Sequence, residues 1–559
     1  MVFEKRVLYE TNAGDQIALL KLNQLKNTAP SLMKGLTFLT IILAAIFAGC
    51  QQVSAPSAEL IKRDTSITAQ NSFSQLFFDS SALEKFVSTE RLHDSLTQRI
   101  KSFYAGRNYQ YAWFFKEGLA DYAAAFVNLT DDYINYTGDS SLYNVSLHQY
   151  MDSIRNDEHI DASDPIVLKT ELLLTSQFFR YSRRAFQGQS RLNVEELEWY
   201  IPRKKIDVVA LLDSVIKNKG KNVSLPVNRQ YSLLRDFLIK YHDIEKGGVW
   251  PRIRVDKKIY RPGDSSQVIS TIKKRLIAGG DSSLHDTTAL FTSSLMQAIK
   301  NFQHCYGLKE DGMINAAVIA EMNHPVTDRI RQILINMERI RWVPAEPMTD
   351  YLLVNIPEFR VHVYEKGNYR WSMNIVAGST THNTIIFTGT LKYIVFSPYW
   401  NVPSSIFKKE ILPAIRRNKN YLATHNMEWY GNGVRQKPGP NNSLGLVKFL
   451  FPNDYNIYLH DTPSKSLFAE PARAFSHGCI RLAEPERLAN FLLRNDSNWD
   501  SVKIKQAMQS RKEKYVNIKE TVPVYIGYFT AWVDRQGKLN FRDDIYGHDQ
   551  KMAQQLFSK

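Results

Sequence analysis

The spacing of apolar residues changes near residue 350, and this change limits the folds open to the chain. Before residue 344, apolar side chains recur at helical intervals, as at Phe115, Leu119 and Tyr122. From Leu353 to Tyr364 they alternate with polar ones, as in a strand with one buried face. The sequence therefore predicts a multidomain α+β protein in which a helical part precedes a mainly β part.

The helical part divides into three segments. Residues 85–250 predict a helical scaffold domain with few Gly or Pro interruptions. Residues 258–324 predict three short helices around one apolar seam, with Gly307 and Gly312 in loop positions of positive φ. Residues 325–349 predict a connecting helix. The β part is expected over 350–498, with a helical and loop-like stretch at 404–434, and a helix and closing strands are expected within 499–559.

The start of the chain carries an export signal. Lys34 precedes a 12-residue, largely apolar run from Leu36 to Phe47, which is followed by Ala-Gly-Cys50. The run is too short for a comfortable membrane span, which needs about 20 residues, so 33–50 predicts a signal peptide. Its end resembles a bacterial lipoprotein box, which implies lipidation of Cys50.

Residues 1–32 precede this signal and are interpreted as a misassigned upstream extension, with Met33 as the initiator. The alternative is a genuine cytoplasmic tail before an uncleaved anchor. Residues 51–84 are rich in Ser, Ala, Gln and Thr and predict a flexible tether.

Charge and cysteine content narrow the function classes. The net charge of +15 favours an anionic partner, but no nucleic-acid motif accompanies it, so nucleic acid is not expected. The chain has only three cysteines. With Cys50 assigned to lipid, Cys305 and Cys479 do not suggest a disulfide framework. Neither CxxC nor HExxH occurs, and neither a metal site nor a cofactor is expected.

The segment Ser476-His-Gly-Cys-Ile-Arg481 combines a cysteine with features that could activate it. His460 lies 19 residues before Cys479. A thiol acts as a nucleophile in its thiolate form, which imidazole and backbone N–H groups favour. A buried structural cysteine is the alternative. The segment Asn456–His460 alternates like a strand that could deliver His460 to the nucleophile.

This spacing resembles the signature of the L,D-transpeptidase (YkuD-type) catalytic domain, whose members cross-link bacterial peptidoglycan. Further segments are similar to the large, multidomain members, and the resemblance runs from about residue 85 to the C-terminus. These segments are Asn336–Trp342, Ser397–Ile406, Arg435–Pro440 and Tyr458–Pro463. The pattern from Phe302 to Gly312 resembles a type 1 peptidoglycan-binding domain, although Asn315 and Val318 replace its usual Gly and Thr. That module is expected either to bind glycan or to brace the enzyme.

The resemblance implies roles for individual residues. Cys479 would be the nucleophile and His460 the general base, while His477 and Gly478 would offer backbone N–H groups to an oxyanion. His477 could instead shape the loop. The resemblance also implies that 404–434 forms a lid over the active site.

Four residues are candidates for contact with substrate. Arg481 suits a substrate carboxylate, and a salt bridge that holds the loop is its alternative. Ser476 and Tyr458 are candidates for substrate contact or for support of the site. Trp400, with Tyr399, would line the donor cleft or pack in the core. Asp461 would either tune His460 or cap a turn.

The resemblance implies a specific reaction. A tetrapeptide stem would acylate Cys479 with release of D-alanine, and the side-chain amine of a second stem would take the acyl group in a 3→3 cross-link. The alternatives are a carboxypeptidase that uses water, transfer to another amine, and an inactive wall-binding lipoprotein. The expected partners are peptidoglycan stems, with glycan as a further candidate, and a membrane through the lipid anchor. The expected location is the periplasmic side of a bacterial envelope.

Overall fold

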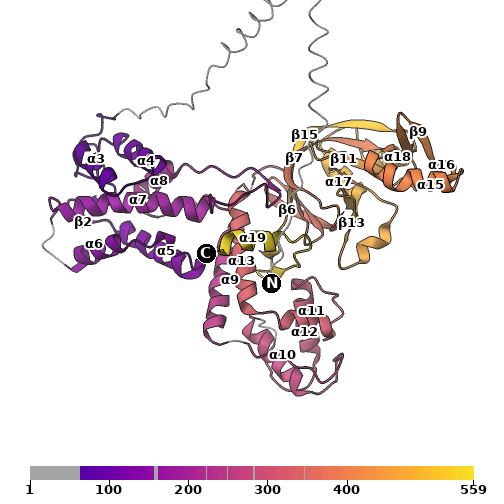
Figure 1. Ribbon diagram of the computed structural model, residues 1–559, viewed down its shortest axis with the longest axis horizontal. Coiled ribbons are helices and arrows are strands. Elements are labelled where there is room, and N and C mark those ends of the chain that lie inside the picture. Colours follow the sequence, from indigo (N-terminus) through magenta and orange to yellow (C-terminus); the bar gives the residue numbers. More distant parts are fainter. Residues whose placement is uncertain are drawn as a thin grey trace, which may run out of the picture.

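A computed structural model describes residues 63–558 apart from 157–160, 222, 224, 249, 281–283 and 345–346. The predictions for 1–32, for the signal peptide and for Cys50 lie outside these residues. Figure 1 shows a helical unit on the left, a mainly β unit on the upper right and a small helical module below them. This arrangement confirms the predicted multidomain α+β class.

The helical unit is built around the 23-residue helix α7 (Pro165–Gln187). Asp164 caps its first turn and Gly188, with φ of 81°, follows its last residue. Glu171 lies buried in the middle of α7 and accepts hydrogen bonds from the backbone of Ala112 and Trp113. The surrounding elements are α3 (Ser80–Thr89), α4 (Asp94–Ala105), β1 (Phe114–Phe115), β2 (Gly118–Leu119), α5 (Asp121–Thr137), η1 (Ser140–Leu142), α6 (Val145–Asn156), β3 (Trp199–Tyr200), α8 (Val208–Lys217) and α9 (Arg229–Lys246).

The tether predicted for 51–84 is wrong over its described part. The buried Ser74 hydroxyl donates to the carbonyl of Phe114 at 2.8 Å, and Phe77 forms a β-bridge with Gln110. Helix α3 then begins at Ser80. The composition of this segment does not reveal its packing, because its partners lie about 40 residues away in the sequence.

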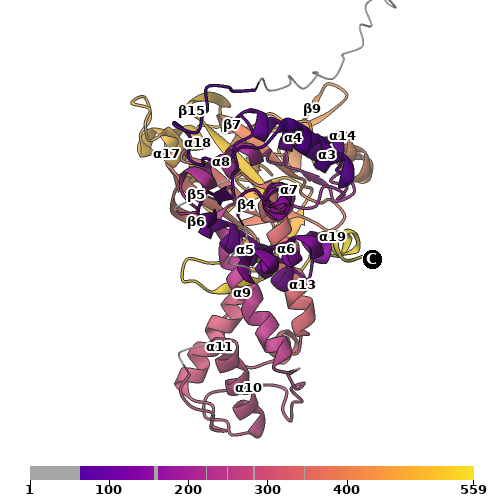
Figure 2. The ribbon, with the colours of Figure 1, turned by 90° about the vertical axis from the view of Figure 1, so that its left-hand side faces the viewer.

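The small module contains the three predicted helices, α10 (Gln267–Ala278), α11 (Ser293–Cys305) and α12 (Ala316–Met322). They enclose a core of their own that includes Ile272, Leu295 and Val318. Gly307 and Gly312 have φ of 67° and 71°, as predicted. Figure 2 shows the module projecting below the rest of the molecule on α9 and α13 (Val326–Trp342).

Helix α13 joins the helical unit to the β unit through buried polar groups. Glu338 accepts a hydrogen bond from the backbone of Gln189 at 2.7 Å and pairs with Arg341. Arg341 also donates to the carbonyl of Ala185. On the other side, the Asn336 amide bonds both the backbone and the hydroxyl of Thr530. The motif at 336–342 is therefore a structural junction.

The β unit is a sheet that closes on itself, because the strand order β11-β12-β14-β6-β5-β4-β15-β7 ends with β7 paired to β11. Strand β3 from the helical unit adds to β7. The strands are β4 (Tyr351–Asn355), β5 (Arg360–Glu365), β6 (Asn368–Gly378), β7 (Ile386–Phe396), β11 (Val447–Leu450), β12 (Leu459–His460), β14 (Ile480–Leu482) and β15 (Lys514–Gly527). Helices α17 (Pro485–Leu493) and α18 (Ser501–Gln509) follow β14.

Two predictions about this unit need correction. The alternation over 353–364 covers two antiparallel strands, because the chain reverses at Phe359, which has φ of 55°. The predicted boundary at 498 cuts through the sheet, since β15 lies between β4 and β7. After β15 come β16 (Ala531–Val533), β17 (Leu539–Phe541) and α19 (His548–Phe557).

The predicted lid region lies at the outer end of the β unit (Figure 1). It has a small core of Ile411, Met427 and Val434. The prediction of helix and loop missed a hairpin here, formed by β9 (Met427–Tyr430) and β10 (Gly433–Gln436) and joined by β8 (Trp400–Asn401). The helical elements are α14 (Ser404–Ile406), the π-helix η2 (Phe407–Ile411), α15 (Leu412–Arg417) and α16 (Tyr421–Thr424).

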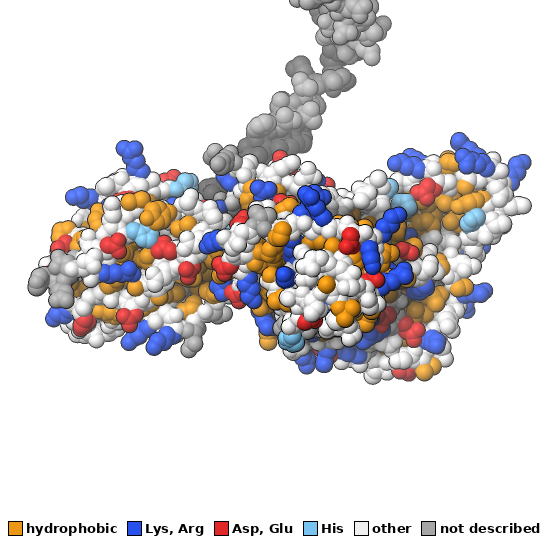
Figure 3. Space-filling view, turned by 90° about the horizontal axis from the view of Figure 1, so that it is seen from below, with side chains coloured by type: hydrophobic (Ala, Val, Ile, Leu, Met, Phe, Trp, Pro, Cys, Tyr) orange, Lys and Arg blue, Asp and Glu red, His pale blue; other side chains and the backbone are white. Residues whose placement is uncertain are grey.

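The described surface carries many cationic side chains. Seen from below, Lys and Arg side chains are spread over both ends of the molecule (Figure 3). Within the described residues, no helix combines the length and apolar character that crossing a bilayer requires.

Candidate active site

The nucleophile segment is a tight turn between β13 (Ala474–Ser476) and β14. Gly478 has φ of 108° in this turn, a conformation that L side chains rarely adopt. Its carbonyl accepts a hydrogen bond from the Thr384 hydroxyl at 2.8 Å. The Ser476 hydroxyl donates to the carbonyl of Cys479 at 2.5 Å. These bonds hold the turn from both sides of the cysteine.

The strand register brings the predicted catalytic residues to one face of the sheet. Strands β12 and β14 are parallel, with Leu459 opposite Ile480 and His460 opposite Arg481. Leu459 and Ile480 point into the core. Because side chains alternate along a strand, His460 and Arg481 share the opposite face with the residues two positions before them, Tyr458 and Cys479.

The thiol of Cys479 is half-buried and lies against β12. Its Sγ donates to the carbonyl of Asn456 at 3.5 Å and also contacts Tyr458. Burial raises the pKa of the thiol, and the contacts with Tyr458 and the charge of Arg481 oppose this effect. Among the described residues, no hydrogen bond joins Cys479 to His460; catalytic bonds are often long without substrate.

His460 is buried, and its tautomer follows from one contact. Its Nδ1 lies 2.5 Å from the carbonyl oxygen of Asp461. A carbonyl only accepts, so Nδ1 carries the proton and Nε2 is the nitrogen that can take another. Burial, followed by the charge of Arg481, lowers the pKa of His460 to about 3. The imidazole is therefore neutral near pH 7.

Asp461 contacts the imidazole of His460 and also holds a turn, which were the two alternatives predicted for it. Its backbone carbonyl orients His460. Its buried carboxylate accepts the N–H of Leu446 at 2.8 Å and the ammonium of Lys465 at 2.6 Å, which holds the turn before β11. An added Cβ at Gly445 would lie 2.4 Å from this carboxylate, so the turn passes very close to Asp461.

Arg481 has no ion pair within the part of the chain that the structure describes, and its Nε is buried without a hydrogen-bond partner. The salt bridge considered as its alternative role is therefore absent from this part. Burial lowers the pKa of Arg481, and proximity to Cys479 raises it. A half-buried guanidinium beside the thiol, with donors unused, is suited to a carboxylate or another anionic oxygen.

The other residues of the hexapeptide serve the loop. The N–H of Gly478 donates to the Ser476 hydroxyl at 3.1 Å, so the prediction of this N–H as an oxyanion donor is wrong for this conformation. Ser476 is buried and supports the turn. The side chain of His477 is exposed, and its Nε2 lies 3.1 Å from a carboxylate oxygen of Glu410 in η2.

The aromatic residues proposed for the donor cleft belong to the lid. Trp400 packs on the lid core that contains Ile411. The ring of Tyr399 lies beneath the Arg435 guanidinium, 4.1 Å from its carbon.

Three residues of this site escaped the sequence analysis. Thr384 and Tyr546 brace the nucleophile turn, since the Tyr546 hydroxyl donates to the carbonyl of Gly378 at 2.5 Å and Gly378 donates to Thr384. Glu410 links the lid to His477. None of them lies in a recognisable motif, and each is more than 65 residues from Cys479 in the sequence.

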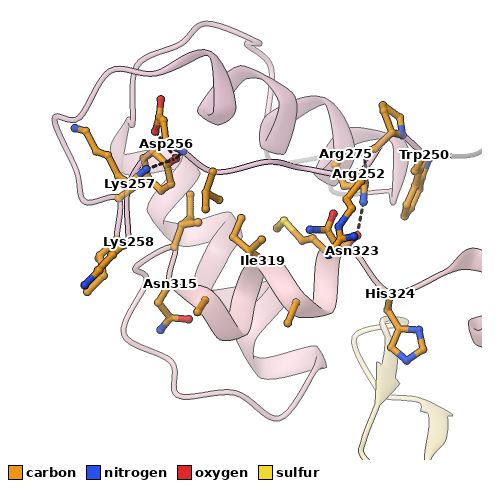
Figure 4. A pocket seen from close by; sticks show the side chains of 18 of the residues that line it. Trp250, Arg252, Asp256, Lys257, Lys258, Arg275, Asn315, Ile319, Asn323 and His324 are labelled. Carbon is orange, nitrogen blue, oxygen red and sulfur yellow. Dashed lines mark hydrogen bonds between the residues drawn. The ribbon is translucent and has the colours of Figure 1, made fainter.

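The small module contacts the β unit through one surface and has a cavity on another. Its contact with the β unit includes hydrogen bonds from Arg542 to the carbonyls of His304 and Cys305 at the end of α11. The cavity, of about 1400 Å³, lies between α12 and residues 250–260 (Figure 4). Arg252 and Lys258 line it, and the Arg275 guanidinium carbon lies 4.7 Å from the centre of the Trp250 ring. The hydrogen bonds that brace the module against the β unit therefore do not involve residues that line the cavity.

Three segments of the chain match known protein families. Residues 349–526 match the L,D-transpeptidase catalytic domain (YkuD), 98–238 match a "Scaffold domain", and 265–322 match the family described as "Putative peptidoglycan binding domain". The resemblance drawn from the sequence is thus confirmed.

Individual relatives share parts of the chain. A Haemophilus influenzae protein named "Putative L,D-transpeptidase" is 28% identical over 243 residues, which are 40% of this chain and 49% of that protein, so the chain spans about half of this curated relative. A solved L,D-transpeptidase from Xylanimonas cellulosilytica is 12% identical and aligns over 49% of this chain and 100% of its own, with a TM-score of 0.19. Another from Stackebrandtia nassauensis is 15% identical over 49% and 98%, with a TM-score of 0.21.

Proposed function

We propose that the protein is a cysteine-dependent L,D-transpeptidase that cross-links peptidoglycan stems. The observation that carries this proposal is the shared face of β12 and β14, where a thiol, a neutral imidazole and an unpaired guanidinium lie side by side. The match of 349–526 to the L,D-transpeptidase catalytic domain supports the choice of reaction, and the peptidoglycan-binding match supports the choice of substrate.

The first step acylates Cys479. Its thiol proton passes to Nε2 of His460 as Sγ attacks the carbonyl carbon of the third residue of a donor stem. The C–N bond to D-alanine then breaks, and the proton leaves with the D-alanine amine. Arg481 binds a carboxylate of the donor, and the backbone N–H of Cys479 replaces Gly478 as the oxyanion donor that we assign.

The second step transfers the acyl group. The side-chain amine of another stem attacks the thioester and gives its proton to His460. The C–S bond breaks, Sγ regains a proton, and a 3→3 cross-link remains. Water in place of the amine would give a carboxypeptidase on the same thioester.

Incubation of the described body of the protein, from residue 63, with tetrapeptide muropeptides tests this proposal. We expect cross-linked dimers and free D-alanine, read by mass spectrometry, because the buried site favours an amine over bulk water. Tripeptides without dimers would replace transpeptidation with hydrolysis. Absence of both products would overturn the proposed activity.

The acid limb of the pH–rate profile is expected to lie well below pH 6.5. His460 accepts a proton only when it is neutral, and burial with the Arg481 charge lowers its pKa to about 3. Activity that depends on neutral His460 is thus kept as pH falls and is lost only as pH approaches that value. In Arg481→Gln the limb should move to higher pH, because a charge that disfavours imidazolium is removed.

Measurement of kcat/KM from pH 2.5 to 9 checks this prediction, with His477→Ala as the matched control. His477 is exposed and paired with Glu410, so its loss should leave the acid limb in place. A limb near 6.5 that disappears in His477→Ala would make His477 the base.

We also propose that the protein reaches the wall as a lipoprotein anchored at Cys50. The signal-like residues before Cys50 support this, and mass spectrometry of the mature N-terminus tests it. A mature peptide that contains Met1 would overturn it.

A further inference from the structure

A second cavity, of about 1660 Å³, lies between the units of the molecule. Its walls are strands β4 to β6, the loop at 307–310 of the small module, residues 468–473 and the hairpin of β16 and β17. Neither Cys479 nor His460 lines it.

Of the five arginines that line this cavity, four follow residue 350. They are Arg360, Arg473, Arg535 and Arg542, and none of them makes an ion pair with a described residue. Arg360 donates to the Ser372 hydroxyl at 2.6 Å, Arg473 donates to backbone carbonyls, and Arg535 stacks on the ring of Tyr369. These partners are neutral, so the four positive charges stay uncompensated by direct contact.

The carboxylates of the cavity are largely engaged with other groups. Glu358 pairs with His362 at 2.8 Å, Glu310 pairs with His304, and Asp534 accepts from the Asn540 amide. Glu470 and Asp543 are the remaining acids, and Arg229 and Lys309 the remaining bases. None of these acids forms an ion pair with the four arginines among the described residues, although Glu358 is near enough to Arg360 and Arg542 for their charges to lower its pKa.

The electrostatics of the buried groups agree with an excess of positive charge. Burial, then repulsion from Arg360 and Arg542, lowers the pKa of Arg473 to about 10. Although burial acts in the other direction, His362, Arg542 and Arg360 lower the pKa of Glu358 to about 2. An anion that entered the cavity would relieve this repulsion.

Strand register places this cavity on the same face of the sheet as the nucleophile. Arg481 lies opposite Val376 of β6, and Arg360 lies opposite Asn374. Residues two apart on β6 point to the same side, about 7 Å apart. Strands β14 and β5 flank β6, so the backbones at Arg481 and Arg360 are roughly 12 Å apart, and Cys479, two residues before Arg481, is roughly 16 Å from Arg360. An extended stem of five residues spans up to about 17 Å.

We propose that this cavity binds the carboxylates of the acceptor stem while the donor stem occupies Cys479. Residues 468–473 line the cavity, and the carbonyl of Phe468 accepts from the Asn374 amide at 3.3 Å. A pentapeptide acceptor with a carboxylate held at Arg360 spans the distance to the thioester, and Arg535, which stacks on Tyr369, lies farther along the same cavity. This inference rests on the proposed transpeptidase function and names its second substrate site.

The test separates acylation from transfer. The donor is a tetrapeptide muropeptide, and the acceptor probe is a synthetic pentapeptide stem with a free side-chain amine. Arg360→Gln, Arg535→Gln and the double variant are compared with Arg331→Gln, an exposed arginine of α13 that does not line the cavity. Arg535 is exposed, so its variant folds even if Arg360→Gln does not.

We expect thioester formation, followed by protein mass and D-alanine release, to stay within about twofold in all variants. The KM for the acceptor should rise about tenfold in each cavity variant, because charge-assisted hydrogen bonds are lost. An unchanged acceptor KM in the double variant, or an equal fall in acylation, would overturn the acceptor site. Absence of the thioester in every protein, wild type included, would instead overturn the proposed function.

Discussion

Replacement of Cys479 by alanine is expected to abolish both thioester formation and cross-linking. Every proposed step passes through Sγ, and no other described cysteine lies near His460, since Cys305 belongs to α11 of the small module. Loss of a covalent nucleophile typically lowers kcat by about 10⁴-fold or more. Intact-protein mass after incubation with donor, together with the rate of dimer formation, measures both effects.

Cys305→Ala is the matched control, because it removes the other cysteine side chain among the described residues. Its cross-linking rate should stay within about twofold of wild type. Dimers formed by Cys479→Ala at the wild-type rate would remove this thiol from the mechanism.

Replacement of Glu338 by alanine should destabilise the junction between the helical and β units by about 3–5 kcal/mol, the cost of breaking a buried ion pair. Arg341 would keep a buried positive charge without its carboxylate, and the N–H of Gln189 and the indole N–H of Trp342 would lose their acceptor. In the native protein, Gly188 lies so close to the Glu338 carboxylate that an added Cβ would overlap it. The substitution relieves this crowding, but the relief is small beside the lost hydrogen bonds.

The midpoint of urea unfolding, followed by tryptophan fluorescence, measures this loss. Glu84→Ala is the control, since Glu84 forms an exposed pair with Lys101 and exposed pairs contribute about 0–1 kcal/mol. Equal midpoints for the two variants would show that the junction does not depend on Glu338.

Local patterns predicted the elements whose contacts are local. The three helices of the module follow from apolar spacing because they share one small core. The common face of His460 and Cys479 follows from alternation in two short segments that become parallel neighbours. Predictions failed where distant residues decide the outcome. Residues 74–78 pack on the segment 109–114, and the chain reverses at Phe359 although the alternation of apolar residues continues through it.

The residues of the candidate site also fall into two groups, those that local patterns predict and those that contacts between distant segments determine. Its nucleophile, base and guanidinium lie in one motif, so the sequence predicted them as a group. The hydrogen bond that removes Gly478 as an oxyanion donor depends on the rotamer of Ser476, which no pattern encodes. The supports from Thr384 and Tyr546 depend on the closure of the sheet, and the partner of His477 depends on where the lid lies.

The hydroxyl of Tyr546 reaches the strand that supports the nucleophile turn from a point 13 residues before the C-terminus. Strand β15, in the middle of the closed sheet, also comes late in the chain. Because a polypeptide is synthesised from its N-terminus, Cys479 emerges before the segments that fix its surroundings. The helical unit has its own local helices and can fold while synthesis continues. The thiol therefore gains its finished environment only after β15 and the segment around Tyr546 have folded against the sheet, which ties the onset of reactivity to the last steps of folding.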